Sequence, residues 1–171
     1  MTLLAELLAD GALAAVAGTG FGAASHPPAR AFKYIAILSA VGHASRFFLM
    51  TRCGVDIATA SFFASFIVGL LSLWFGSASR CPMTVLYIPA LLPMIPGMYA
   101  YKSVFALVMF MQHLDEPALA ATYQQELLSN LIATVSTVFL LSVGATILIF
   151  LLPKKVYSLT RRKGNRDGIT R

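Results

Sequence analysis

Residues Leu92–Lys102 read LPMIPGMYAYK and place two prolines, a glycine and a lysine inside one long apolar run. The run extends from Met83 to Met111, and as one helix it would reach roughly 43 Å, against about 30 Å of bilayer hydrocarbon. Proline lacks a backbone donor and clashes with the preceding turn, so a helix must kink or break at Pro93 and Pro96. Backbone groups freed at membrane depth need protein or enclosed water as partners. The sequence therefore predicts a broken membrane helix, an element that forms the substrate sites of many transporters.

The composition is that of an integral membrane protein. Of the 171 residues, 58% are hydrophobic and 12% are charged, whereas soluble domains carry about 25% charged residues. The apolar segments are continuous rather than alternating, which indicates helices. Five segments are long enough to span a bilayer or nearly so, namely Leu3–Ala24, Ala31–Thr51, Ile57–Gly76, Met83–Met111 and Leu127–Leu152. We therefore predict an all-α, compact membrane bundle of about five transmembrane helices, with the fourth broken at Pro93–Gly97. It forms one domain, 1–153, followed by a basic tail at 154–171.

The distribution of charge predicts the orientation of the spans, because basic residues mark the cytoplasmic side. One face receives the basic residues Arg30, Lys33, Arg80 and those of the tail, and the other receives Asp56, Asp115, Glu116 and Glu126 against Arg52 alone. This pattern predicts five crossings, with the N-terminus outside and the C-terminus inside. The tail is expected to contact anionic lipid, and the net charge of +6 does not indicate nucleic acid.

Two features near the ends of the spans add to this topology. Glu6 and Asp10 interrupt the first apolar run, so we interpret it as an uncleaved helix whose acidic end lies at the outer interface. Cys53 and Cys81 flank the third span and are expected to be free thiols on opposite faces, about 30 Å apart.

The second span carries Ser39, His43 and Arg46 on one helical face. An ionisable residue inside a span is costly and indicates function. Arg46 either supplies a buried charge or extends to the outer interface. His43 either pairs with a carboxyl group, carries a proton or hydrogen-bonds a neighbouring helix.

Three further residues complete the set of candidates. Lys102 follows the break by five residues, and the depth of the break decides whether it meets substrate or solvent. A buried Lys102 together with Arg46 would favour a carboxylate. Tyr101 and Asn130 carry polar groups that can orient a substrate, although interface anchoring and helix packing are the alternatives.

The chain contains no motif for nucleotide binding or nucleophilic catalysis. His26, His43 and His113 lie in three different segments, so no metal-ligand spacing is present. We predict neither enzymatic activity nor a cofactor or metal. A membrane enzyme using His43 as a base would lack a carboxylate at comparable depth.

Two motifs together resemble a known family. The first is Gly42-His43-Ala44-Ser45-Arg46 followed by Leu49-Met50, and the second is Pro93-Met94-Ile95-Pro96-Gly97 with Tyr101. In order and spacing over about residues 5–150, the chain is similar to the small membrane subunit of bacterial two-component threonine/serine exporters. The resemblance implies a multi-pass secondary transporter of the bacterial inner membrane. With the orientation predicted from charge, its N-terminus is periplasmic and its C-terminus is cytoplasmic. It also implies a larger membrane subunit of the same family as partner.

The resulting hypothesis is a membrane subunit that exports small carboxylates with its larger partner. The resemblance implies threonine and serine as substrates, and succinate-like dicarboxylates for two-component members. A dicarboxylate is expected first, because the short chain fits the two-component form and two cations suit a dianion, and threonine or serine is expected second. The proposed substrate-binding residues are His43, Arg46, Pro93, Pro96, Gly97, Tyr101, Lys102 and Asn130. The alternative is a structural subunit whose partner holds the whole substrate site. Five helices are few for a transporter, so a higher oligomer is the expectation if no partner exists.

Overall fold

The computed structural model describes residues 3–151, and every regular element in that range is a helix. In chain order they are α1 (Leu3–Ala24), η1 (Ala29–Ala31), α2 (Phe32–Cys53), α3 (Ile57–Ser79), α4 (Met83–Leu91), η2 (Leu92–Met94), α5 (Gly97–Gln112) and α6 (Pro117–Leu151). Four helices are long and apolar enough to cross a membrane, and a fifth span results if α4, η2 and α5 count as one bent span. The prediction of an all-α membrane fold is confirmed. The basic tail predicted at 154–171 lies outside the described residues.

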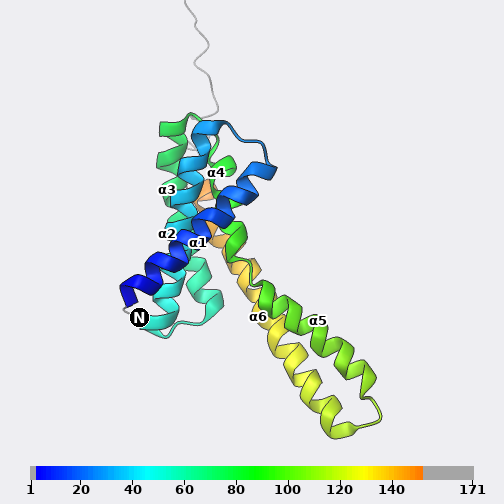
Figure 1. The fold of residues 1–171 in the computed structure, drawn as a ribbon. Helices are drawn as coiled ribbons and strands as arrows, with labels where there is room; N and C mark the ends of the chain where they lie inside the picture. Colours follow the sequence, from blue (N-terminus) through cyan, green and yellow to red (C-terminus); the bar gives the residue numbers. More distant parts are fainter. Residues whose placement is uncertain (1–2, 152–171) are drawn as a thin grey trace, which may run out of the picture.

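Helices α1 to α4 and the C-terminal part of α6 form a bundle (Figure 1). Its centre is apolar, and Ile35, Leu38, Val68, Leu86 and Met94 are fully buried there. The hydroxyl-bearing face of α3 is buried as well, with Ser61, Ser65 and Ser72 inaccessible. Each of these serines donates to a backbone carbonyl of its own helix. The α3 stripe therefore serves helix packing.

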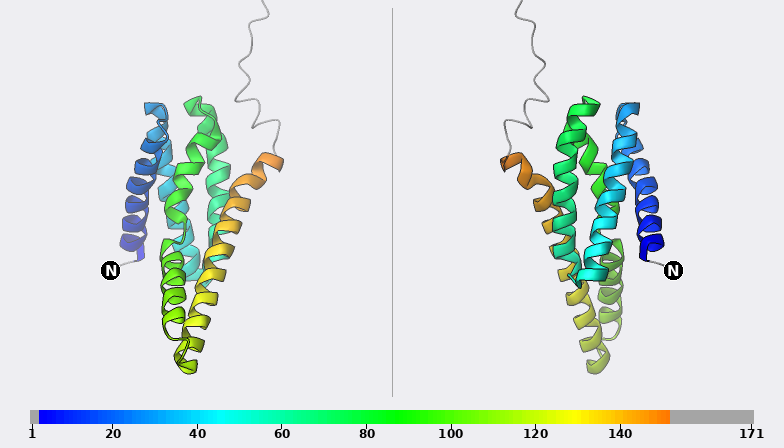
Figure 2. Two further views of the ribbon diagram at one scale, coloured as in Figure 1. Left: turned by 90° about the vertical axis from the view of Figure 1, so that its right-hand side faces the viewer. Right: turned by 90° about the vertical axis from the view of Figure 1, so that its left-hand side faces the viewer.

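Helix α5 and the N-terminal half of α6 run side by side away from the bundle (Figures 1 and 2). We call this helix pair the arm. The arm begins at the break, where the chain bends by 49° between Met83–Met94 and Gly97–Gln112. The expectation of one compact bundle was therefore wrong, because the bend directs α5 away from α1 to α3. Helix α6 also begins ten residues before the predicted Leu127, and its 35 residues span about 52 Å. Its polar first turns remain helical because they pair with α5 outside the bundle.

Close helix contacts in the bundle depend on glycines. A Cβ at Gly18 of α1 would lie 1.8 Å from Ser39 Oγ and 2.8 Å from Ser39 Cβ on α2. A Cβ at Gly144 of α6 would lie 2.5 Å from the backbone oxygen of Phe62 on α3. These glycines let the helix backbones approach one another, as small residues do at membrane helix interfaces.

The turn between α2 and α3 follows the usual chemistry of helix ends. Gly54 ends α2 in a left-handed conformation, at φ 63°. Asp56 then caps α3 by accepting a 2.9 Å hydrogen bond from the Thr59 backbone N–H. The hydroxyl and the backbone N–H of Thr59 lower the pKa of Asp56 below its usual range.

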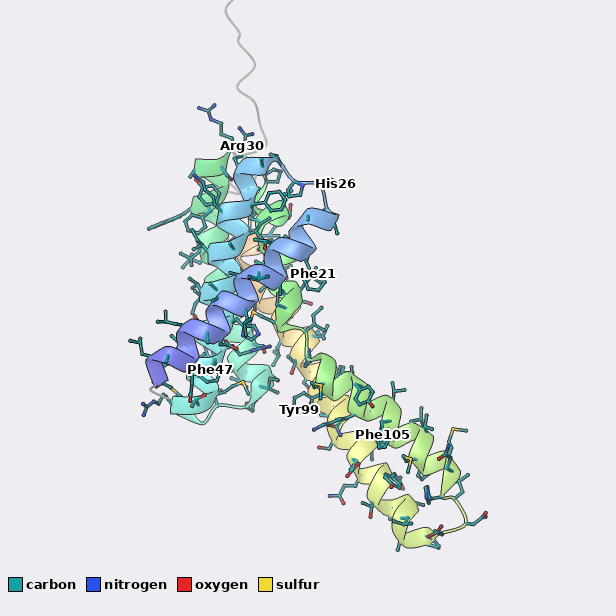
Figure 3. All side chains as sticks on the ribbon, in the orientation of Figure 1. Phe21, His26, Arg30, Phe47, Tyr99 and Phe105 are labelled. Carbon is teal, nitrogen blue, oxygen red and sulfur yellow. The ribbon has the colours of Figure 1, made fainter. Side chains whose placement is uncertain are left out.

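The loops lie at the two ends of the bundle as predicted, with those of Arg30 and Arg80 at one end and that of Asp56 at the other. Arg30 Nη2 donates to the Arg80 carbonyl oxygen at 3.5 Å, which joins the α1–α2 and α3–α4 connections at one end. Figure 3 shows Arg30 at that end and Phe47 toward the other. Cys53 is exposed and Cys81 is buried, and both are free thiols, as predicted.

A polar cluster at the helix break

The break leaves the backbone carbonyl of Met94 without its helical partner. Ile95 adopts an extended conformation, with φ −62° and ψ 129°, and ends η2. The carbonyl of Met94 would normally accept from the backbone N–H four residues later, but the chain has left the helix by then. Arg46 of α2 donates to this carbonyl instead through Nη1. A cation at the C-terminal end of a helix is favourable because the carbonyl dipoles point toward it.

Two further side chains extend this contact into a cluster of Asp10, His43 and Arg46. Arg46 Nη2 lies 3.0 Å from His43 Nε2, and His43 Nδ1 lies 2.6 Å from Asp10 Oδ2. The side chains of His43 and Asp10 are 21% and 26% exposed. The cluster therefore joins α1, α2 and the broken span through a continuous chain of polar contacts.

The cluster lies close to the middle of the bundle. His43 follows the start of α2 by 11 residues, and Met94 follows the start of α4 by 11 residues. At 1.5 Å per residue both lie roughly 16–20 Å from the Arg30 end, against about 30 Å of hydrocarbon. Arg46 does not extend to the interface, because its guanidinium is held at the break.

The two sequence motifs meet at this point. A Cβ at Gly42 would lie 2.6 Å from Val68 Cγ2 and 3.3 Å from Met94 Sδ. Gly42 thus leaves room for the buried Met94 side chain, while Arg46 binds the Met94 carbonyl. The motif on α2 and the motif at the break form one packed unit.

Asp10 is the residue that the sequence analysis misplaced. It was expected at the outer interface with Glu6, and no carboxylate was expected at the depth of His43. The structure pairs Asp10 directly with His43. The sequence does contain a signal for Asp10 as a site residue, because a carboxylate inside an apolar span indicates function by default.

The other predicted site residues divide into two groups. Pro93, Pro96 and Gly97 form the break itself, with Pro96 buried and Gly97 exposed. Tyr101 and Lys102 are exposed on the arm, where the Tyr101 ring stacks on Phe105. Figure 3 shows Tyr99 where the arm leaves the bundle and Phe105 further along it. Asn130 donates to the Glu126 carbonyl of its own helix at 2.7 Å. The structure thus joins His43 and Arg46 to the break, and no described hydrogen bond joins Tyr101, Lys102 or Asn130 to them.

Two open apolar grooves lie on the bundle. One, of about 600 Å³, is lined by α1, α2 and α3, and the other, of about 300 Å³, lies between the α4–η2 segment and α6. Asp10, His43 and Arg46 line neither groove. The cluster is therefore separate from both grooves, and its His43 and Asp10 side chains keep 21% and 26% of their surface exposed. Within residues 3–151, no group of three or more His, Cys, Asp or Glu side chains is arranged to hold a metal ion.

Ionisable side chains and a helix break at the same depth of an all-helical membrane protein define the class of helical transporters. A family model described as Threonine/Serine exporter, ThrE matches residues 10–151. The chain belongs to the threonine/serine exporter family, and it is a membrane exporter protein. No solved structure matches it.

Proposed function

We propose that the chain is a membrane subunit of a secondary transporter that exports small amino acids of the threonine and serine type. The observation that carries this proposal is the pairing of opposite charges at the break, where Asp10 and Arg46 flank His43. Family membership supports export as the activity. The larger partner subunit and the inner-membrane location are parts of the same proposal.

The charge balance of the cluster favours a zwitterion as substrate. Arg46 offers a planar fork of donors that suits a carboxylate. Asp10 offers an acceptor for an ammonium group, and the Met94 carbonyl offers a second one at the break. With one ionised carboxyl and one guanidinium, the cluster carries little net charge, so a neutral zwitterion matches it better than a dianion.

A succinate-like dicarboxylate is the second candidate. The sequence favours it because Arg46 and Lys102 would place two cations near the break. In the structure Lys102 is exposed on the arm, and the negative charge of Asp10 lies beside His43. The dicarboxylate proposal therefore depends on Lys102, whereas the amino-acid proposal depends on Asp10. This difference makes Lys102 the discriminating position.

Export assays test the two substrates directly. Cells without endogenous exporters would express the full chain with a larger membrane subunit of the family, and efflux of labelled threonine and succinate would be measured. We expect the wild-type chain to export threonine. Arg46→Gln should lower the rate of threonine efflux roughly tenfold or more, because a hydrogen-bonded charge is removed. Lys102→Gln should leave that rate unchanged.

Three outcomes would contradict the proposal. Succinate efflux that Lys102→Gln abolishes would favour the dicarboxylate. Full activity of Arg46→Gln at normal expression would exclude this cluster as the site. Photocrosslinking of substrate to the larger subunit alone would favour the structural-subunit alternative.

A further inference from the structure

The hydrogen bonds of the cluster define the protonation state of His43. A guanidinium has only donors, so Arg46 Nη2 must donate to His43 Nε2 across the 3.0 Å contact. The Nε2 atom therefore carries no proton, and the single imidazole proton resides on Nδ1. From there it is donated to Asp10 Oδ2 at 2.6 Å. His43 is thus neutral, and Asp10 holds it in the tautomer that presents a lone pair to Arg46.

This arrangement makes two events mutually exclusive. A proton added to Nε2 would set a donor against a donor and a cation against a cation, so Arg46 would have to leave His43. The same guanidinium binds the Met94 carbonyl at the break. His43 therefore cannot take up a proton while Arg46 is hydrogen-bonded to both His43 and the Met94 carbonyl.

The charged surroundings of His43 are simple. Among the helices packed against α2, α1 contributes Asp10, with Glu6 one turn away on an exposed position. Helix α3 contains no charged residue, and α4 contributes only Tyr87 as a titratable group, with none from η2. On α2 itself Arg46 is in contact, whereas Lys33 in the first turn and Arg52 in the last turn are exposed at the two ends. The short helix η1 adds only the exposed Arg30. Asp10 and Arg46 are thus the two charged groups that His43 contacts.

We propose that Asp10 is a positioning residue of the export site, which fixes the tautomer of His43 and so makes the release of Arg46 depend on a proton. The proton enters from water and binds Nε2. Asp10 remains ionised beside the resulting imidazolium, and Arg46 keeps all its protons and turns toward the substrate carboxylate. An N–H bond forms at Nε2 with a proton that hydronium gives up as it becomes water, and otherwise only hydrogen bonds break and form. The proposal rests on the proposed export function, because the released guanidinium needs an anionic group to bind.

Nitrogen NMR of the full chain, labelled with ¹⁵N-histidine in lipid nanodiscs, tests the tautomer without any substrate. The signals of His43 would be identified as those absent from His43→Gln. We expect a protonated Nδ1 and an unprotonated Nε2 at neutral pH, and protonation of both on acidification. Asp10→Asn should weaken this preference, because an amide can donate to Nδ1 as well as accept from it, and only Arg46 then still favours an unprotonated Nε2. Glu6→Gln is the matched control one turn away, and it should leave the spectrum unchanged.

The pH profile of efflux tests the coupling. Wild-type efflux should change over the pH range in which His43 titrates by NMR. Asp10→Asn should abolish the pH dependence of efflux and slow efflux roughly tenfold. Asp10→Glu should restore part of the pH dependence and part of the rate. Glu6→Gln should behave as wild type. A wild-type spectrum with the proton on Nε2, or an unchanged tautomer in Asp10→Asn, would overturn the proposal. A confirmed tautomer with no pH dependence of efflux would overturn the coupling.

The two proposals fail in different ways. If no amino acid is exported but His43 shows the expected tautomer and Asp10 controls it, the assigned substrate is wrong and the positioning role of Asp10 stands. If threonine is exported and Asp10→Asn keeps both the tautomer and the pH profile, the export function stands and the role of Asp10 is wrong. If Asp10→Asn does not fold, the wild-type spectrum and the Asp10→Glu profile still decide between these outcomes.

Discussion

Arg46 makes two different contacts with one side chain. Its guanidinium replaces the lost backbone donor at Met94 and also donates to His43. A guanidinium can make both contacts because its donors are fixed in a planar fork. A lysine has the same charge but concentrates it on a single nitrogen, so it cannot reproduce the geometry.

Arg46→Lys is therefore expected to weaken the bundle as well as transport. The loss of one charged hydrogen bond costs about 2 kcal/mol, which corresponds to roughly 4–8 °C in Tm for a chain of this size. Thermal unfolding in detergent would measure the shift, with Arg52→Lys at the exposed end of α2 as the control. A Tm equal to that of wild type would mean that the Met94 carbonyl does not need the guanidinium.

The contact between α3 and α6 anchors the C-terminal half of α6 to the bundle. It is the most extensive helix contact of the described residues, and Gly144 of α6 lies in it against Phe62 and Ser65 of α3. A Cβ there would meet Ser65 Oγ at 2.2 Å and the Phe62 carbonyl oxygen at 2.5 Å, and the Phe62 backbone cannot rotate away as a side chain can. This contact sets the direction in which α6 leaves the bundle toward the arm.

Gly144→Ala should therefore push α3 and α6 apart. Overpacking of this kind costs about 1–3 kcal/mol. Gly20→Ala is the matched control on α1, because a Cβ there meets nothing within 4 Å and alanine is the better helix former. Thermal unfolding should place Gly144→Ala well below wild type and Gly20→Ala at or above it. Equal stability of the two variants would show that the α3–α6 contact is looser than described.

The whole molecule consists of a bundle and an arm that meet at the break. The arm surface is apolar, with Met98, Val104 and Met111 more than 60% exposed, so lipid or another protein surface must cover it in the membrane. Because α2 and α3 are two spans that lie between them in the chain, both connections joined by Arg30 and Arg80 face the same side. The predicted orientation assigns that side to the cytoplasm.

Labelling of the native cysteines tests that orientation. Cys53 is exposed at the opposite end from Arg30, whereas Cys81 is buried. A membrane-impermeant maleimide should therefore label Cys53 in spheroplasts, and Cys53→Ser should abolish the signal. Labelling that appears only after permeabilisation would reverse the orientation.

The spans, the break and the segregation of charge were predictable from the sequence, because transfer into hydrocarbon and the missing donor of proline act locally along the chain. The family motifs likewise marked His43, Arg46 and Pro93–Gly97. The arm was not predictable, because the direction of a chain after a break depends on which partner helix it meets. The partner of His43 was not predictable either. Asp10 is 33 residues away, and the register and rotation of α1 against α2, set by the close contact at Gly18, bring the two side chains together.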